Sequence, residues 1–315
     1  METGRELFDR FLRGDRVPRA AFLPFLSTLA ARVGGTTLER MTSDPGAWAA
    51  SLLKAADLLD ADGVVVGFDW TLLAEGCGAR IGWDGDRPRV EGPTRSLSDA
   101  PESVGRLATA LEAARRVFAV CRPRRGCVAA LTGPVTLAHQ LFGPEEASGR
   151  LADAKLLTVR VAEAICRERP DMLCLLERGE WGPEGPTPAH RRVYSTLKNV
   201  ASYYNIPLVL YLEDYDPPTL ASLAALRADV YLLGPAPGNR DPAPGDLLHL
   251  TAEAQGLGPC LALDDVTAVD EWARLGQEIG SQLRGWFAAG FDPPGREVDL
   301  ETAHVVVRRI RELRR

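Results

Sequence analysis

The sequence of 315 residues is long enough for one large α/β domain or for two ordinary domains. Hydrophobic residues make up 45% and charged residues 25%, and the net charge is −6, as is typical of globular proteins in water. No basic stripe indicates a nucleic-acid partner, and no apolar run approaches the roughly 18 residues that a membrane-spanning helix needs. The charged segment 1–14 predicts no secretory signal, and the six scattered cysteines, without a Cys-x-x-Cys pair, indicate reduced thiols in the cytoplasm.

Eight apolar runs predict β-strands, most of them separated by segments with a helical pattern. The run that ends at Asp69 is rich in valine, which is typical of a parallel strand buried on both faces. In chain order the strands are expected at 20–26, 62–68, 127–131, 171–177, 207–213, 229–233, 259–263 and 285–289, the last of them weak. Helices are expected at 5–12, 45–59, 101–118, 150–168, 188–204, 218–227, 267–283 and 299–314.

Two segments fall outside this alternation: 80–90 predicts a hairpin that turns at Asp84-Gly85, and 234–245 is a loop rich in glycine and proline. Strand–helix alternation implies a parallel sheet with right-handed crossovers. Eight such units in this length predict an α/β fold, a single (β/α)₈ barrel domain over 1–315 with a small hairpin after the second strand. A doubly wound sheet is the alternative. The absence of a Gly-x-Gly-x-x-Gly segment after a strand and of a P-loop argues against nucleotide binding.

The residues that follow the predicted strands are strongly acidic. In a barrel these residues line one mouth, where such enzymes place their chemistry. The mouth is expected to contain Asp69, Glu75, Thr132, Glu177, Glu180, Trp181, Tyr211, Glu213, Asp214, Asp216, Asp264, Asp265 and Asp292. Such a rim suits a cation, a metal bound through oxygen ligands, or a carboxyl of raised pKa acting as a general acid. The alternative is that many of these carboxylates cap the helices that follow, a reading we set aside for Asp69, Glu177 and Glu213, which end the most apolar strands.

Three stretches carry a resemblance to a known family: Asp44-Pro45, the run 62–69 with Ala74-Glu75-Gly76-Cys77-Gly78, and 131–138, which reads Leu-Thr-Gly-Pro-Val-Thr-Leu-Ala. With these motifs the chain resembles the uroporphyrinogen decarboxylase superfamily along nearly its whole length. That superfamily has a (β/α)₈ fold and includes the decarboxylase and the methylcobalamin:thiol methyltransferases. The segment 38–78 is closer to the methyltransferase branch.

The departures from the family patterns are as informative as the matches. The Arg-Gln-Ala-Gly-Arg-Tyr segment of the decarboxylases, whose arginines hold substrate carboxylates, corresponds to 25–32, where Arg32 is the basic residue. The zinc-binding His-x-Cys and late Cys of the methyltransferases correspond to Tyr211-Leu212-Glu213 and Phe291, so we expect no tightly bound zinc. Asp69 matches the family's strand-end aspartate, which stabilises positive charge on a pyrrole ring.

The resemblance therefore implies decarboxylase-type (carbon–carbon lyase) chemistry on a small carboxylated substrate other than uroporphyrinogen. The alternatives are a corrinoid-linked methyltransferase without the usual zinc site, with a separate corrinoid protein as partner, and a paralogue that only binds a tetrapyrrole or corrinoid. Asp69, Glu177, Tyr211 and Glu213 are the expected catalytic residues. The expected substrate-binding residues are Phe25, Glu75, Thr132, Trp181, Phe291 and Asp292. No cofactor is expected, and a homodimer is an open alternative.

Overall fold

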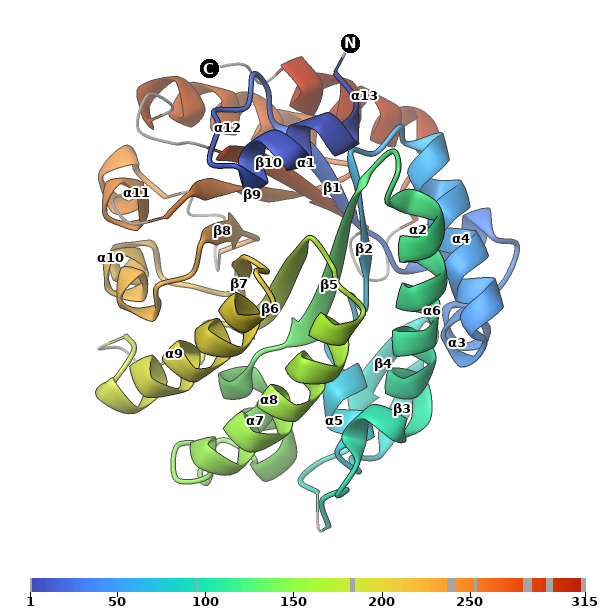
Figure 1. Cartoon of the computed structure of the whole chain (residues 1–315), viewed down its shortest axis with the longest axis vertical. Coiled ribbons are helices and arrows are strands. Elements are labelled where there is room, and N and C mark those ends of the chain that lie inside the picture. Colours follow the sequence, from blue (N-terminus) through green and yellow to red (C-terminus); the bar gives the residue numbers. More distant parts are fainter. Residues whose placement is uncertain are drawn as a thin grey trace.

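Eight parallel strands form a nearly closed barrel surrounded by helices, as the sequence predicted (Figure 1). A computed structural model of the chain describes residues 2–94, 96–181, 185–236, 242–251, 254–279, 285–292 and 297–312. The strands follow one another in the order β1-β10-β9-β8-β7-β6-β5-β2. Their bounds are β1 Ala21–Phe25, β2 Gly63–Val66, β5 Gly126–Thr132, β6 Met172–Arg178, β7 Leu208–Glu213, β8 Val230–Leu233, β9 Gly256–Ala262 and β10 Gly285–Phe291.

The two outer strands of this order, β1 and β2, meet at one point of the barrel wall. The Asp62 backbone N–H donates to the Phe22 carbonyl oxygen at 3.1 Å, and the Phe22 N–H donates to Asp62 Oδ2 at 2.9 Å. Arg19 holds the same carboxylate through both oxygens, at 2.6 and 2.8 Å. A carboxylate thus completes the barrel where strand pairing ends.

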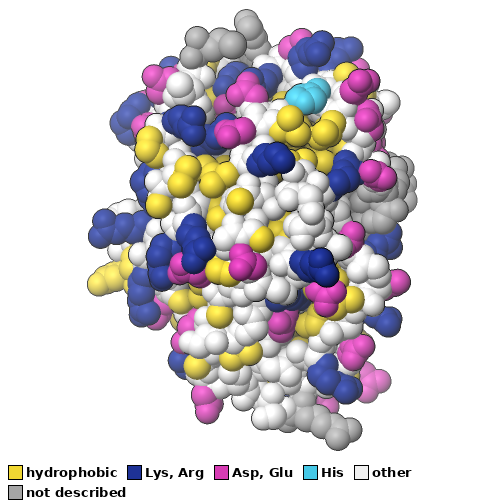
Figure 2. Space-filling model, turned by 90° about the vertical axis from the view of Figure 1, so that its right-hand side faces the viewer, with side chains coloured by type: hydrophobic (Ala, Val, Ile, Leu, Met, Phe, Trp, Pro, Cys, Tyr) yellow, Lys and Arg dark blue, Asp and Glu magenta, His cyan; other side chains and the backbone are white. Residues whose placement is uncertain are grey.

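Helices cover the outside of the barrel, between the strands in sequence (Figure 1). They are α1 Gly4–Leu12, α2 Thr28–Val33, α3 Leu38–Ser43, α4 Pro45–Leu58, α5 Leu72–Gly76, α6 Gly105–Cys121, α7 Pro134–Phe142, α8 Leu151–Arg167, α9 Pro188–Tyr203, α10 Leu220–Leu223, α11 Pro244–Thr251, α12 Val266–Ile279 and α13 Leu300–Glu312. No helix of the described residues is both long and apolar enough to cross a membrane. Figure 2 shows the side that carries α4 and α6, where basic and acidic side chains are interspersed with apolar ones.

Side chains of the strands alternate between the barrel interior and the helices. In β6, Met172, Cys174 and Leu176 belong to the interior cluster, whereas Leu173 and Leu175 pack among the helices. This period of two follows from the pleat of a strand. It decides which residues at the strand ends face the mouth of the barrel.

The predicted hairpin is present as a separate antiparallel pair, β3 Ile81–Asp84 and β4 Arg87–Val90. It turns after Asp84, as expected, and positive φ at Gly85 (58°) fits the tight turn. Because it lies between α5 and α6 in sequence, it is an excursion from the barrel alternation.

Several short elements were missed by the sequence analysis. The helices α2, α3 and α5 are five or six residues long, too short to show a helical period, and α7 was not among the expected helices. Helix α11 begins at Pro244, within the expected loop 234–245, because proline suits the first turn of a helix. The helix expected at 218–227 is broken into 3₁₀ turns around α10. The end of the helix expected at 267–283 lies outside the described residues.

Candidate functional site

A cavity of about 1010 Å³ opens at the carboxyl ends of the barrel strands. Its walls come from the loops that follow β1, β2, β8 and β10, from the ends of β6 and β7, from α3 and α7, and from the hairpin. Barrel enzymes place their active sites at this end, and the volume is at the upper end of the range for small-molecule sites. Of the expected site residues, Asp69, Glu213, Phe291 and Asp292 line it.

Arg178 is a cavity residue that the sequence analysis missed. It ends β6 with the same parity as Leu176, so its side chain faces the mouth. Its guanidinium carbon lies 4.8 Å from the centroid of the Trp70 ring, a cation–π contact. A guanidinium on the cavity wall can bind an anionic ligand through charge-assisted hydrogen bonds.

Glu213 stands beside Arg178 at the end of the neighbouring strand, and the two residues are partners in the parallel register. The Tyr211 hydroxyl donates a short hydrogen bond to Glu213 Oε1. Burial raises the pKa of Glu213, against the opposing effects of this hydrogen bond and of the Arg178 charge. A carboxyl in this state can hold a proton and deliver it into the cavity.

Tyr211 forms part of an aromatic floor inside the barrel rather than of the cavity wall. It is fully buried and stacks on Phe25 with ring centroids 5.6 Å apart. Phe68 meets both rings edge-on and also lines the cavity. Burial raises the pKa of Tyr211 well above its ordinary value, so the phenol stays neutral and acts as a hydrogen-bond donor. Phe25 and Tyr211 therefore support Glu213 and Phe68 from below.

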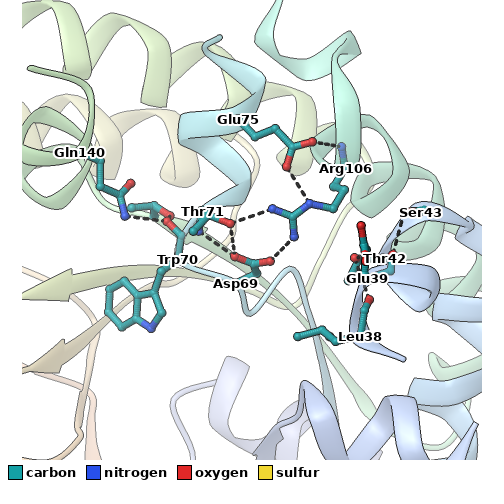
Figure 3. Close-up of polar contacts among 11 residues, drawn as sticks. Leu38, Glu39, Thr42, Ser43, Asp69, Trp70, Thr71, Glu75, Arg106 and Gln140 are labelled. Atoms are coloured by element: carbon teal, nitrogen blue, oxygen red, sulfur yellow. Dashed lines mark hydrogen bonds and ion pairs between the residues drawn. The ribbon is translucent and has the colours of Figure 1, made fainter. Parts of the chain in front are cut away.

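Asp69 lines the cavity but is held by other side chains (Figure 3). Its Oδ1 accepts hydrogen bonds from the Thr71 backbone N–H and hydroxyl, both at 2.7 Å, and its Oδ2 lies 2.5 Å from a guanidinium nitrogen of Arg106. Glu75, expected to bind substrate, instead pairs with Arg106 at 2.7 Å, on the side away from the cavity wall. The negative charge at Asp69 is thus partly neutralised from behind.

Glu177 does not line the cavity, unlike the expectation for a catalytic acid. Strand parity turns it toward the helices, where its oxygens accept hydrogen bonds from the Val135 N–H at 3.1 Å and the Thr136 N–H at 2.8 Å, and from the Tyr194 hydroxyl. Burial raises its pKa to about 7 despite these donors. A side chain on Gly133 would collide with Glu177, which explains the glycine in the Thr-Gly-Pro segment. Glu177 thus caps the start of α7.

Three other residues that were expected to bind substrate make contacts that stabilise the fold. Two of them, Thr132 and Trp181, lie outside the cavity wall. The Thr132 hydroxyl donates to the Trp70 carbonyl at 3.0 Å, and so helps to place Trp70. Trp181 packs between His190 and Tyr194. Asp292 lines the cavity, but its oxygens accept hydrogen bonds from Ser27, Thr28 and Leu29 at 2.5–3.3 Å, so it caps α2. Burial raises the pKa of Asp292.

The rim is less acidic than expected, because basic side chains share it. The hairpin contributes Arg87 and Arg89 to the cavity wall, beside Asp84 and Asp86. His139 of α7 also lines the cavity, and its Nδ1 lies 3.8 Å from Glu180 Oε1. Burial raises the pKa of Glu180. The arginines at alternate positions of a predicted strand, 87 and 89, were a signal available in the sequence.

Comparison with known proteins decides the family. A model of the family described as uroporphyrinogen decarboxylase (URO-D) matches residues 3–162, just over half of the 315-residue chain. The chain belongs to the uroporphyrinogen decarboxylase (URO-D) family. A search of curated proteins gives no match to this URO-D family member.

Solved structures agree on the fold of this URO-D family chain. A methyltransferase from Methanosarcina mazei superimposes with a TM-score of 0.77, covering 99% of both chains at 19% sequence identity. Dispersin B gives a TM-score of 0.43 at 9% identity, covering 95% of this chain and 99% of its own, and nothing is inferred from it. At 19% identity the likeness to the methyltransferase shows the fold alone.

The zinc site that the methyltransferase branch implies does not fit the residues of this URO-D chain. Phe291 has no ligand atom, and the Tyr211 hydroxyl is buried and donates to Glu213. Among the residues that the structure describes, no three His, Cys, Asp or Glu side chains cluster closely enough to hold a metal ion. The polar groups available to a ligand are therefore Arg178, Glu213 and their neighbours on the cavity wall.

Proposed function

We propose that the cavity binds a small carboxylated substrate with a flat, electron-rich ring and removes a carboxyl group as CO₂. One observation carries this proposal: Arg178 and Glu213 stand side by side in a single cavity. Arg178 supplies a cation for the substrate carboxylate, and Glu213, with its raised pKa, supplies a proton. Membership of the URO-D family supports the same reaction class.

The proposed reaction uses the residues of the chain without a cofactor. Glu213 in its neutral form gives its proton to the ring carbon that carries the carboxylate, which places a positive charge on the ring. The bond between that carbon and the carboxylate then breaks, its electron pair restores the ring, and CO₂ leaves. Glu213 regains a proton from water.

Arg178 and Asp69 have separate parts in this proposal. Arg178 orients the carboxylate against the face of Trp70, and the pair fixes the ring within reach of Glu213. Asp69 lies on the same cavity wall and stabilises the cationic ring electrostatically, with an effect moderated by Arg106. Tyr211 keeps Glu213 in one orientation.

Methyl transfer is the second candidate, because the methyltransferase from Methanosarcina mazei matches the fold over the whole chain. It would need a methyl donor from a separate corrinoid protein and an acceptor activated without the usual zinc ligands. A barrel that binds a tetrapyrrole or corrinoid without turnover is the third. The three candidates differ in whether the protein releases CO₂ from a ring carboxylate, transfers a methyl group, or only binds its ligand.

The test measures CO₂ release from ring carboxylates labelled with ¹³C in the carboxyl group, with pyrrole-2-carboxylate as the first compound. Wild type should release labelled CO₂, and Glu213→Gln should lose about 10²–10⁴-fold in rate, the usual contribution of a general acid. The matched control is Glu278→Gln, an exposed carboxylate on α12. Unchanged turnover in Glu213→Gln contradicts the assignment. Transfer of a methyl group from methylcobalamin to a thiol, without CO₂ release, would favour the second candidate.

A further inference from the structure

Arg106 is a nearly buried arginine that joins three parts of the chain at the edge of the cavity. Its guanidinium contacts Asp69 Oδ2 at 2.5 Å, the Thr71 hydroxyl at 2.8 Å and Glu75 Oε2 at 2.7 Å. These partners belong to the loop after β2 and to α5, whereas Arg106 itself lies in the first turn of α6. Figure 3 shows its side chain lying between Asp69 and Glu75.

The local backbone is built to allow this arrangement. Glu75 accepts from both the Arg106 side chain and the Arg106 backbone N–H, the latter at 3.0 Å. Gly105 precedes Arg106 with a φ of 54°, and a Cβ there would lie 2.4 Å from Glu75 Oε1. Only glycine allows both the backbone conformation and the close approach of Glu75.

The planar face of the Arg106 guanidinium lies against the hairpin. The guanidinium carbon of Arg106 is 5.0 Å from the centroid of the Trp83 ring on β3. Trp83 itself is not part of the cavity wall, but its neighbour Asp84 and the strand β4 are. At the hairpin turn, Asp86 Oδ1 accepts a hydrogen bond from the Leu38 N–H at 3.3 Å. Arg106 and the Leu38 N–H therefore both contact the hairpin, the first at Trp83 and the second at Asp86.

We propose that Arg106 is a positioning residue that couples the hairpin over the cavity to the carboxylate of Asp69. One rigid guanidinium fork fixes the orientation of Asp69 with one edge and holds Trp83 with its face. The position of Arg87 and Arg89 over the cavity then depends on the ion pair at Asp69. The inference rests on the proposed function only in taking this cavity as the ligand site.

Hydrogen–deuterium exchange of the hairpin amides, residues 81–90, tests the coupling without any ligand. We expect Asp69→Asn, which lies outside the hairpin, to speed exchange there about tenfold, because Arg106 loses one of its two carboxylate partners. Trp83→Leu should have the same effect, and the double variant should add no further increase because the connection is already broken. Arg106→Lys should not restore the wild-type rate, since a lysine keeps the charge but loses the fork.

Controls separate the coupling from general loss of stability. Arg116→Lys, an exposed position on the same helix, should leave the hairpin unchanged, and exchange in α8 should stay at the wild-type rate in every variant. A wild-type hairpin rate in Asp69→Asn, or full rescue by Arg106→Lys, would overturn the proposal. Acceleration in α8 as large as in the hairpin would overturn it as well.

Binding of pyrrole-2-carboxylate, measured by calorimetry, gives the second readout. Trp83→Leu should weaken binding about tenfold although Trp83 does not line the cavity. If Trp83→Leu binds the probe as tightly as wild type, the coupling does not reach the site and the proposal fails. If wild type does not bind the probe, the substrate class in the proposed function is wrong, and the exchange measurements still decide the role of Arg106.

Discussion

Arg178 and Glu213 are register partners at the carboxyl ends of neighbouring strands, and both side chains line the same cavity. Because the strands are hydrogen-bonded to each other, the separation of these two residues is set by the sheet and not by a flexible loop. A cation and a carboxyl of raised pKa are thus fixed next to each other before any ligand binds. The testable consequences start from this pair.

Replacement of Arg178 should remove the carboxylate-binding group. We expect Arg178→Met to weaken the binding of pyrrole-2-carboxylate about 10–100-fold, since a hydrogen bond to a charged group contributes about 1.5–3 kcal/mol. The melting temperature should stay close to that of wild type because Arg178 is exposed at the end of β6. Calorimetry with Arg191→Met, an exposed arginine on α9, provides the control. Equal loss of affinity in both variants would count against Arg178.

Loss of the Glu177 proton should lower the free energy of unfolding as the pH rises. Its pKa is about 7 in the folded chain against an ordinary value of 4.5, so the folded state holds a proton that the unfolded state has lost between these values. Protonation of Glu177 contributes about 3 kcal/mol to the free energy of unfolding. This contribution is complete below pH 4.5 and disappears as the pH rises through 7. Urea unfolding of Glu177→Gln over this range should show a flatter pH dependence, whatever its absolute stability. A slope identical to that of wild type and of Glu278→Gln would show that Glu177 does not titrate there.

Asp292 should matter for folding more than an ordinary helix cap. It accepts hydrogen bonds from Ser27, Thr28 and Leu29 in a buried position, and so connects the end of β10 to α2. Asp292→Ala should lower the free energy of unfolding by about 2–3 kcal/mol, because buried donors are left without partners. Asp299→Ala removes an exposed cap at the start of α13 and should lower the free energy of unfolding by clearly less. Denaturant unfolding that gives equal losses would contradict the structural role of Asp292.

The chain should be purified without tightly bound zinc. Tyr211, Glu213 and Phe291 occupy the positions that the methyltransferase branch uses for zinc, and one of the three has no ligand atom. Metal analysis of the purified protein should therefore give far less than one zinc per chain. About one zinc per chain would refute this, and would indicate a site rebuilt around Glu213 and Cys174.

Local patterns were sufficient to predict the barrel. The buried runs and the helical segments between them repeat often enough for the fold to follow, and even the weak strand near residue 287 pairs with β1 and β9 as expected. The position of Glu177 outside the cavity wall has a reason that was readable in the sequence. Met172, Cys174 and Leu176 alternate with residues that face the helices, so the same period of two places Arg178, and not Glu177, at the mouth.

Other features of the site could not be read from the sequence. Arg106 lies 37 residues after Asp69, in the first turn of a helix of ordinary composition, so no local pattern connects the two. Asp292 faces Ser27 only because β1 and β10 are neighbours in the closed sheet. Such contacts depend on how the barrel closes. Counting strands predicts that the barrel closes, but not which side chains then meet.

The most direct test of the proposed function is to follow decarboxylation in D₂O and to locate the label in the product by NMR. Wild type acting on pyrrole-2-carboxylate or a related ring carboxylate should release CO₂ and place one deuterium at the carbon that lost it. Glu213→Gln should abolish this product while Arg178, the carboxylate-binding residue, still allows the substrate to bind. Tight binding by wild type with neither CO₂ release nor deuterium in the ring would contradict the account.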